Sequence, residues 1–287
     1  MGAPMAANLE RAGFSVQTFD LKGHGNRASI REAAEGAEAL VTMLPDGAAV
    51  REAVLEALPM LSPGTVVIDM SSSDPASTRA LEAALSPQKV SLIDAPVSGA
   101  IAKAKDGTLA IMAGGSREAL ARVDPVLRAM GKDIFHVGPV GAGHAVKALN
   151  NYLGAAGTLA GFEALLIAQA FNLDPQPMLE AINASTGRNS TTERKIPQQV
   201  LTGAFASGFK LALMAKDVGI AAGLARGLGL PAPYLKTTLR LWRDAQKRLP
   251  AQADHTEIFR YLERMKPPSR GARARRSSAR RKRRRST

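Results

Sequence analysis

The first half of the chain alternates short apolar runs with longer stretches in which apolar residues recur at helical spacing. We expect strands at the short runs, which are Ser15–Phe19, Ala39–Leu44, Thr65–Met70, Val90–Ala95, Leu109–Ala113 and Asp133–Val137. We expect helices between several of them, most clearly at Ala48–Leu58, Pro75–Leu85 and Arg117–Met130. Strands that alternate with helices of this length predict a parallel sheet with helices on both faces.

After Gly143 the strand-like runs end, and helical periodicity continues to about Met265. Helices are expected at Ala145–Phe171, Gln176–Ser185, Lys210–Leu228, Ala232–Lys247 and Thr256–Met265. The first of them is small and apolar nearly all round, which predicts that it is buried. The pattern therefore predicts an α/β domain over residues 1–140 and an all-α domain over residues 141–265 that begins with a long interdomain helix.

The composition excludes several kinds of site. The 287 residues include no cysteine, so disulfides, a thiol nucleophile and cysteine metal sites are excluded, and a reducing compartment is favoured. Four scattered histidines without an acidic cluster predict no metal site. The sequence has neither a signal-peptide pattern nor an uninterrupted apolar run of membrane-spanning length, which favours a cytoplasmic location and no membrane partner.

Most of the formal net charge of +13 comes from the segment 266–287. Eleven of the 38 Lys and Arg residues lie there without an acid, which leaves 27 basic and 25 acidic residues in the rest of the chain. We expect a disordered basic tail, because a segment without apolar periodicity cannot bury a core. Such a run is typical of a solvated appendage, and the alternative is non-specific contact with nucleic-acid phosphates. Its lack of aromatic residues weakens a specific role in binding nucleic acid.

One segment, GAGHAVKALNN at Gly141–Asn151, concentrates polar side chains at the start of the buried helix. Lys147 and Asn151 are four residues apart and lie on one helical face. Gly138 and Pro139 interrupt regular structure just before it, so Lys147 falls in the first turns of a new helix. Polar groups at the mouth of a buried helix are unfavourable unless they are paired or used. Taken alone, Lys147 is interpreted as a lysine that extends to solvent.

The opening MGAPMAANLERAGFSVQTFD is typical of the second part of a dinucleotide-binding unit. In such units a glycine-rich turn approaches the pyrophosphate, and an acid after the second strand binds a ribose. Gly2 takes the place of the last glycine of GxGxxG, and Asp20 lies 18 residues later. Because the first strand and the first two glycines are missing, we expect either a natural start upstream or weak binding of NAD. Other βα units share this half-motif, so alone it is weak.

Four segments resemble the β-hydroxyacid dehydrogenases, the family of 3-hydroxyisobutyrate dehydrogenase and tartronate semialdehyde reductase. They occur in the family's order: MGAPMAANL at the start, DAPVSGA at Asp94–Ala100, GAGHAVKALNN at Gly141–Asn151 and LMAKDVGIA at Leu213–Ala221. The resemblance extends from Met1 to about Met265. It implies an α/β fold, a Rossmann-type doubly wound parallel sheet with its first strand missing here, followed by an all-α domain. It also implies a homo-oligomer.

For the segment at the start of the helical domain, the resemblance implies a catalytic role. Lys147 matches the lysine that exchanges a proton with the hydroxyl group of the substrate, and burial would lower its pKa toward the working pH. Asn151 would orient the substrate. His144 is a rival base by chemistry, but its position varies in the family, so no role is implied for it.

For DAPVSGA, the resemblance implies a substrate loop at the end of a strand, where ligands bind in open sheets. Ser98 and the backbone of Gly99 would bind the carboxylate of the substrate. An ordinary turn after a strand would have a similar composition. Ala100 departs from the family, which usually has glycine there, and would be strained if the backbone needs a positive φ.

The resemblance further implies contacts with a dinucleotide, and the residues implied are Gly2, Asp20, Leu44, Pro45, Ser72 and Lys216. Leu44–Pro45 matches a turn beside the adenosine and its ribose, and Ser71–Ser72 matches a turn beneath the nicotinamide ribose. Lys216 would reach the cofactor from the helical domain. Each has an ordinary alternative, since proline and serine favour strand ends and Lys216 could form a surface pair with Asp217.

These expectations combine into one function. We expect an NAD(P)-dependent oxidoreductase that transfers a hydride between nicotinamide and a small 3-hydroxy acid resembling 3-hydroxyisobutyrate, interconverting it with the semialdehyde. Asp20 favours NAD because a carboxylate repels a 2′-phosphate, whereas Lys22 leaves NADP possible. Arg188–Lys195, a polar segment expected at the lip of the cleft, is a candidate for selecting the substrate's side group. The alternative is a non-catalytic dinucleotide-binding or nucleic-acid-interacting protein that uses the basic tail.

Overall fold

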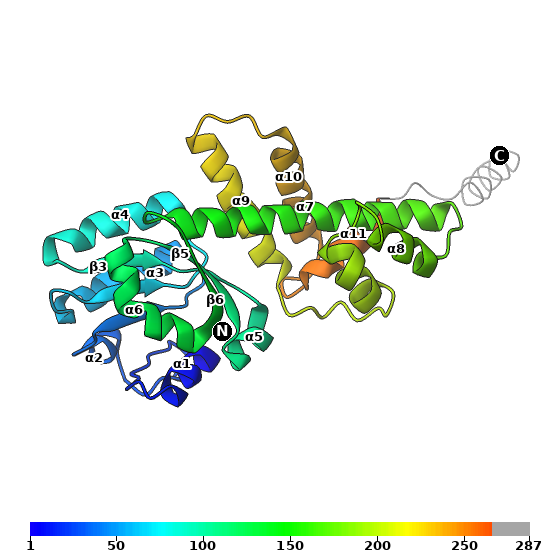
Figure 1. Cartoon of the computed structure of the whole chain (residues 1–287). Coiled ribbons are helices and arrows are strands. Elements are labelled where there is room, and N and C mark those ends of the chain that lie inside the picture. The colour runs from blue at the N-terminus through cyan, green and yellow to red at the C-terminus, as the bar shows by residue number, and fades with distance from the viewer. Residues whose placement is uncertain (266–287) are drawn as a thin grey trace, which may run out of the picture.

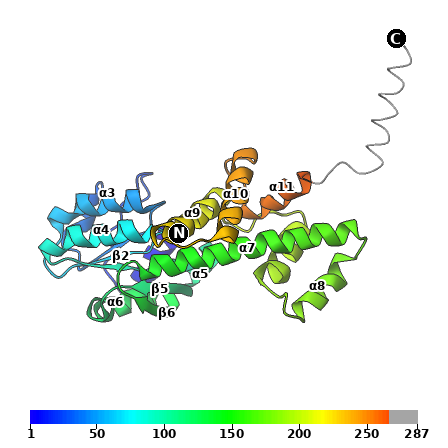
Figure 2. The same ribbon diagram turned by 90° about the horizontal axis from the view of Figure 1, so that it is seen from above.

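The computed structural model describes residues 1–265, which form two bodies joined by one long helix (Figure 1). A six-stranded sheet with helices makes up the N-terminal body, and helices alone make up the C-terminal body. Seen from above, helix α7 (Ala142–Ala170) runs from the sheet along the helical body (Figure 2). The segment 266–287, for which a disordered tail is expected, lies outside the described residues.

The sheet is mixed rather than fully parallel, and the expected Rossmann-type α/β class is confirmed. Its strands are β1 (Ala39–Thr42), β2 (Val66–Asp69), β3 (Ser91–Asp94), β4 (Val97–Ser98), β5 (Leu109–Gly114) and β6 (Gly131–Gly138). Strands β1, β2 and β3 are parallel, and β5 is antiparallel to both β3 and β4 but parallel to β6. The pairs Asp94–Gly114 and Val97–Ile111 share one antiparallel register. Strands β3 and β4 therefore follow one another along β5 and form a hairpin with it. This hairpin reverses the direction of the last two main strands.

Helices cover the sheet on both faces. They are α1 (Gly2–Arg11), α2 (Ile30–Ala34), α3 (Gly47–Ala57), α4 (Pro75–Leu85), α5 (Ala100–Asp106) and α6 (Arg117–Met130), with the short 3-10 segments η1 (Leu58–Met60) and η2 (Ser86–Gln88). Val67 and Leu92 belong to one core cluster, whereas their neighbours Ile68 and Ile93 belong to another. Successive residues of β2 and β3 are therefore buried on opposite faces, as the continuous apolar runs predict.

The strand predicted at Ser15–Phe19 is wrong. This segment has no regular secondary structure and no ladder partner, and β1, the end strand of the sheet, pairs only with β2. The backbone N–H of Thr18 instead donates to Asn26 Oδ1 at 2.8 Å, and the N–H of Asn26 donates to Thr18 Oγ1 at 3.0 Å. A run with strand propensity forms a strand only where a neighbouring strand can accept its hydrogen bonds.

The five helices predicted for the second half of the chain are confirmed. The body contains α7, α8 (Pro175–Asn183), the π-helical segment η3 (Thr191–Val200), α9 (Leu211–Gly227), α10 (Pro233–Arg248), the short η4 (His255–Glu257) and α11 (Ile258–Arg264). Its core contains Phe162 from α7, Val218 from α9 and Trp242 from α10, all fully buried. The segment η3 was not expected, because it is polar and contains Pro197.

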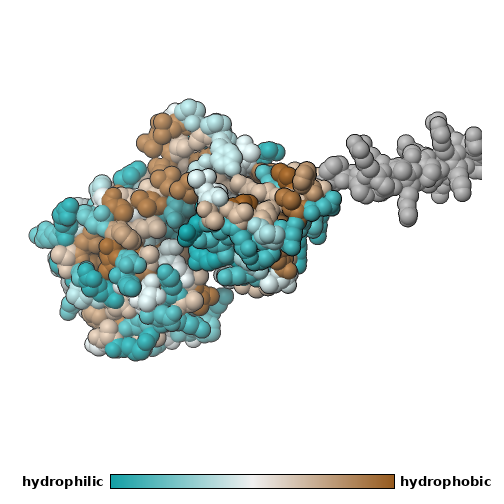
Figure 3. All heavy atoms as spheres, turned by 45° about the vertical axis from the view of Figure 1, so that its right-hand side comes forward, coloured by the Kyte–Doolittle hydropathy of each residue, from teal (hydrophilic) through white to brown (hydrophobic). Residues whose placement is uncertain are grey.

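Helix α7 is the only helix among the described residues that is long and apolar enough to cross a membrane, and half of its most apolar window is buried in the protein. A mostly apolar core helix passes the same test. Other apolar side chains, including Leu228 and Leu230, are exposed at the loop between α9 and α10. This loop is at the top of the molecule in Figure 1, and Figure 3 shows hydrophobic surface at the upper tip.

Candidate functional site

Lys216 on α9 joins the helical body to the loops that follow β1 and β2. Its ammonium donates to the carbonyl oxygen of Ser72 at 2.7 Å and to that of Pro45 at 3.0 Å. Three residues implied for cofactor binding therefore meet at one point, although they lie far apart in sequence. Lys216 also contacts Asp217 Oδ1 at 3.4 Å, so the expected surface pair exists but is only part of its environment.

The two loops around Lys216 are held by a buried carboxylate at the end of β2. Asp69 Oδ1 accepts hydrogen bonds from Thr42 Oγ1 and from the backbone N–H of Ser71, each at 2.9 Å. Ser71 is buried, and its hydroxyl accepts a 2.9 Å hydrogen bond from the backbone N–H of Leu44. The turn at Leu44 and Pro45 is thus fixed to the turn at Ser71 and Ser72. Both turns are held by hydrogen bonds within the protein.

Lys147 lies in the second turn of α7 and is half-buried. Burial lowers the pKa of Lys147, the negative charge of Asp217 opposes this shift, and the ammonium of Lys216 adds to it. A lysine with a lowered pKa can hold the neutral amine nearer to neutral pH than an exposed lysine does. Lys147 can therefore act as a proton acceptor or, when charged, as a donor.

Asn151, one turn after Lys147, is buried and donates through Nδ2 to Asp217 Oδ2 at 2.6 Å. Burial raises the pKa of Asp217, whereas Lys216, the hydrogen bond from Asn151 and the charge of Lys147 lower it. From the sequence, Asp217 is expected only as a partner of Lys216. The available signal was its place beside Lys216 in LMAKDVGIA, but its contact with Asn151 depends on how α7 packs against α9.

The expected substrate loop adopts the backbone conformation that its glycine suggests. Ser98 ends β4 opposite Ala110 of β5, and Gly99, with φ of 138°, precedes α5. Ala100 has φ of 57°, so the expected strain at this departure from the family is confirmed. Within residues 1–265 no hydrogen bond joins Ser98 to Lys147, and the approach of this loop to Lys147 stays a prediction.

Gly2 and Asp20 are less closely tied to the rest of the site. Gly2 begins α1 without a side-chain cap, and a Cβ on Gly2 would meet only Met43, at 3.8 Å or more, just before Leu44. The first turn of α1 therefore lies beside the loop after β1. Asp20 is exposed, and its Oδ1 accepts a 2.8 Å hydrogen bond from the backbone N–H of Lys22 in a local turn.

These residues fit a dinucleotide with an adenosine and a nicotinamide half. The N–H groups of the first turn of α1 have no side-chain acceptor and can bind an anionic phosphate. The carbonyl oxygens of Pro45 and Ser72 accept hydrogen bonds from Lys216, and the exposed carboxylate of Asp20 can bind a ribose hydroxyl. In the part of the chain that the structure describes, no group of three His, Cys, Asp or Glu side chains could hold a metal ion.

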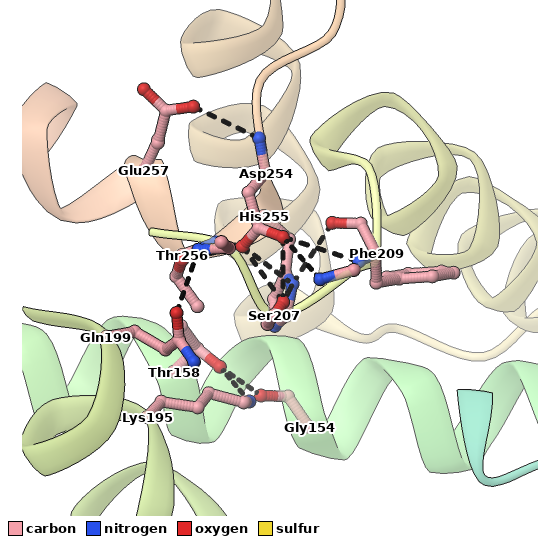
Figure 4. A network of polar contacts seen from close by, with 12 residues as sticks. Gly154, Thr158, Lys195, Gln199, Ser207, Phe209, Asp254, His255, Thr256 and Glu257 are labelled. Atoms are coloured by element: carbon pink, nitrogen blue, oxygen red, sulfur yellow. Dashed lines mark hydrogen bonds and ion pairs between the residues drawn. The ribbon is translucent and has the colours of Figure 1, made fainter. Parts of the chain in front are cut away.

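A second polar network lies further along α7 (Figure 4). Lys195 donates to Thr158 Oγ1 at 2.6 Å, and burial is the main cause that lowers its pKa to about 8. Thr158 follows Lys147 by eleven residues, or about 16 Å along a helix. Arg188–Lys195, expected at the lip of the cleft, therefore contacts a part of α7 remote from Lys147.

His255 in this network provides a test of acid stability. Burial lowers the pKa of His255 to about 4 from 6.5, so between these values the unfolded chain binds a proton that the folded chain does not. The free energy of unfolding should therefore fall by up to about 3 kcal/mol as pH decreases from 6.5 to 4. Urea unfolding of the wild type and of His255→Gln measures this, and the variant should lose less. If both proteins lost the same free energy of unfolding, the lowered pKa of His255 would not be the cause.

Comparison with known proteins covers both bodies. Residues 1–138 match the family described as the NAD-binding domain of 6-phosphogluconate dehydrogenase. Residues 141–262 match the family described as NAD-binding of NADP-dependent 3-hydroxyisobutyrate dehydrogenase. The two matches meet just before α7, between the sheet body and the helical body.

Individual relatives extend over nearly the whole chain. A 2-(hydroxymethyl)glutarate dehydrogenase of Eubacterium barkeri is 33% identical over 92% of each chain. An NAD-dependent L-serine dehydrogenase of Pseudomonas aeruginosa is 36% identical over 90% of this chain and 93% of the relative. The structure of a 3-hydroxyisobutyrate dehydrogenase of Mycobacterium tuberculosis with L-serine is similar at a TM-score of 0.86, with 32% identity, 91% coverage of this chain and 95% of that chain.

Proposed function

The chain belongs to the β-hydroxyacid dehydrogenase family and is an NAD(P)-dependent hydroxyacid dehydrogenase, and on this premise we propose that Lys147 is its general acid and base. The observation that carries the proposal is the cluster at the junction of α7 and α9. There a half-buried Lys147 with a lowered pKa lies one helical turn from Asn151, which is bonded to Asp217. Lys216 connects that cluster to the loops of the sheet body.

The chemistry requires a group that removes the hydroxyl proton while hydride leaves the same carbon. A bound nicotinamide cofactor would supply the hydride acceptor, and the neutral amine of Lys147 would accept the proton. In the reverse direction the ammonium of Lys147 returns the proton to the aldehyde oxygen. The lowered pKa of Lys147 makes its neutral amine more accessible than that of an exposed lysine, which favours acid–base catalysis.

We propose that the substrate is a small 3-hydroxy acid with a primary alcohol. The named substrates of the three relatives, 2-(hydroxymethyl)glutarate, L-serine and 3-hydroxyisobutyrate, share the unit HO–CH2–CHR–COO⁻ and differ in R. Ser98 and the backbone of Gly99 would bind the carboxylate. Asn151, held by Asp217, would orient the hydroxyl group toward Lys147.

For the cofactor we propose contacts along the ends of β1 and β2, with residues 1–140 as the binding domain. The proposed residues are Gly2, Asp20, Leu44, Pro45, Ser72 and Lys216. Gly2 would approach the pyrophosphate, and Asp20 would bind the adenosine ribose. The exposed carboxylate of Asp20 favours NAD over NADP, because it would repel a 2′-phosphate.

The proposal is tested by a turnover screen of the full chain. We expect reduction of NAD with 3-hydroxyisobutyrate, L-serine or 2-(hydroxymethyl)glutarate, with a higher kcat/KM for NAD than for NADP. A 2-hydroxy acid such as lactate is the matched control, because its hydroxyl group is one carbon closer to the carboxylate. Equal turnover of lactate, or no turnover of any 3-hydroxy acid, would contradict the proposal.

We further propose that the protein is a homo-oligomer built on the outer face of α7. Leu149, Leu153, Ile167 and Phe171 on this face are 45–76% exposed. Leu153 and Ile167 each lie seven residues from Ala160, and Leu149 and Phe171 each lie eleven residues from it. Two copies that cross antiparallel at Ala160 would therefore bury Leu153 of one against Ile167 of the other. Self-complementarity of this kind is what a two-fold interface requires.

Charge placed on this face should separate the copies. We expect light scattering to find a dimer or larger assembly for the wild type and a monomer for Leu153→Glu. Leu228→Glu, at an exposed site on the loop between α9 and α10, is the control and should keep the wild-type mass. A monomeric wild type, or an unchanged assembly in Leu153→Glu, would refute the interface.

The alternative of a non-catalytic or nucleic-acid-interacting protein gains no support from the relatives, which are named dehydrogenases. The basic tail on which that alternative depends lies outside the described residues. A cytoplasmic location stays a prediction.

A further inference from the structure

Asp94, the last residue of β3, is fully buried and binds the start of α7. Its Oδ1 accepts a 2.7 Å hydrogen bond from the backbone N–H of Gly141, and its Oδ2 accepts one of 2.8 Å from the N–H of His144. The first N–H groups of a helix have no intrahelical partner. Since the N-cap residue Gly141 supplies no side chain, the carboxylate of Asp94 caps α7 from another element.

Two glycines bring α7 directly onto the backbone of the sheet. A Cβ on Gly143 would overlap the carbonyl oxygens of Met112 and Asp94. A Cβ on Gly114 would overlap Asp94 Oδ1 and the backbone nitrogen of Gly143. The first turn of α7 therefore rests on β3 and β5 without an intervening side chain, and the two hydrogen bonds to Asp94 fix its position there.

The side of α7 next to Asp94 contains further donors. Thr78 Oγ1 donates its proton to the carbonyl oxygen of Asp74 at 3.0 Å, so in its 2.8 Å contact with His144 Nδ1 it accepts, and Nδ1 carries a proton. The imidazole of His144 also lies 3.7 Å from Asp94 Oδ2 and 3.6 Å from Asp69 Oδ2. Burial raises the pKa of Asp94, whereas the charge of His144 and the two N–H donors lower it.

Both elements that Asp94 joins continue into residues of the proposed reaction. Ser98 and Gly99 follow Asp94 by four and five residues, and Lys147 follows His144 by three, about one helical turn. The substrate loop and the proton acceptor are therefore tied to each other through one carboxylate. Proton and hydride transfer require the reacting atoms within a narrow range of distance, and a misplacement of about 1 Å can reduce the rate about 100-fold.

We propose that Asp94 is a positioning residue for the dehydrogenase reaction, whose carboxylate holds the first turn of α7, and with it Lys147, at a fixed distance from the substrate loop. The inference rests on the proposed roles of Lys147 and Ser98. Asp94 is buried beneath α7 and acts through the position of Lys147.

The kinetic test is Asp94→Asn, which keeps the shape of the side chain but turns one acceptor into a donor that faces a backbone N–H. We expect kcat per NAD-binding molecule to fall about 10- to 100-fold, with the KM for the hydroxy acid and the Kd for NAD changed less than about threefold. The limb of the kcat–pH profile that reports the pKa of Lys147 should also move. A displaced Lys147 would lie at other distances from the charges of Lys216 and Asp217, which act on its pKa.

Two control variants separate positioning from folding. Asp254 in the helical body also accepts backbone N–H groups from two segments, Gly208 at 3.0 Å and Thr256 at 2.9 Å, so Asp254→Asn should lose stability but keep kcat. Thr78→Val removes a partner of His144 and leaves both bonds to Asp94, so it should also keep kcat. A wild-type kcat in Asp94→Asn, or an equal loss in Thr78→Val, would overturn the proposal.

Hydrogen exchange of the wild type gives a readout that needs neither turnover nor a folded variant. Amides in the first turn of a helix normally exchange readily, whereas those of Gly141 and His144 should exchange as slowly as amides of the core strands. Fast exchange at both amides would refute the proposed role of Asp94 in holding the first turn of α7. Slow exchange in a protein that turns over no 3-hydroxy acid would instead reject the proposed function, while the two hydrogen bonds to Asp94 would still be supported.

Discussion

Replacement of Lys147 by Ala lowers kcat for oxidation of a 3-hydroxy acid by about 1000-fold, while the Kd for NAD stays within about threefold of the wild type. General acid–base groups contribute about 100- to 10,000-fold, and Lys147 is the half-buried amine placed beside Asn151 and Asp217. Lys147→Arg should be similarly slow, because a guanidinium keeps its proton at the working pH and cannot accept another. Steady-state kinetics with saturating NAD and a fluorescence titration of NAD measure both quantities.

The control for this variant is another lysine of the helical body. Lys195 is also half-buried, has a pKa lowered to about 8 and contacts α7 at Thr158, remote from Lys147. Lys195→Ala removes a similar amine and should leave kcat within about threefold of the wild type. If Lys195→Ala and Lys147→Ala were equally slow, or if Lys147→Ala kept most of its kcat, the assignment of Lys147 would be wrong.

Replacement of Asn151 by Ala lowers kcat/KM by about 100-fold. The variant loses the side chain proposed to orient the substrate and leaves Asp217, a buried carboxylate, without its 2.6 Å donor. Misorientation of the reacting groups by about 1 Å accounts for a loss of this size. Kinetics with 3-hydroxyisobutyrate should show both a lower kcat and a higher KM.

A half-buried amide elsewhere tests whether the loss is only structural. Asn183 Nδ2 donates to the carbonyl oxygen of Thr192 at 3.2 Å in the helical body. Asn183→Ala should lower the melting temperature without changing kcat/KM. If its kcat/KM fell as far as that of Asn151→Ala, a loss of helical packing would explain both results, and Asn151 would have no specific role.

Features that depend on neighbouring residues in the sequence could be predicted well. The apolar runs placed β2 and β3 correctly, and the strong periodicity of Pro75–Leu85 and Arg117–Met130 placed α4 and α6 with the same bounds. The spacing of Lys147 and Asn151 was sufficient to put both on one face of α7. The resemblance placed a glycine at position 100, so strain was predicted for Ala100 if its φ is positive. The structure has a positive φ there.

Features that depend on tertiary partners could not be predicted. Ser15–Phe19 has the composition of a strand, yet it has no neighbouring strand to pair with. Asp217 is 66 residues from Asn151, and only the packing of α7 on α9 makes them partners. Asp94 belonged to a recognised segment, but its bonds to Gly141 and His144 cross from the sheet to a helix that begins much later.

The central claim, that Lys147 accepts the proton of the alcohol, is tested most directly by the pH dependence of kcat in Asp217→Asn. The charge of Asp217 raises the pKa of Lys147, and the amide oxygen of the variant can still accept the hydrogen bond from Asn151. Because oxidation needs the neutral amine, kcat should rise with pH through the pKa of Lys147. We predict that this limb moves to lower pH in Asp217→Asn, and a limb that stays in place or moves to higher pH would contradict the account.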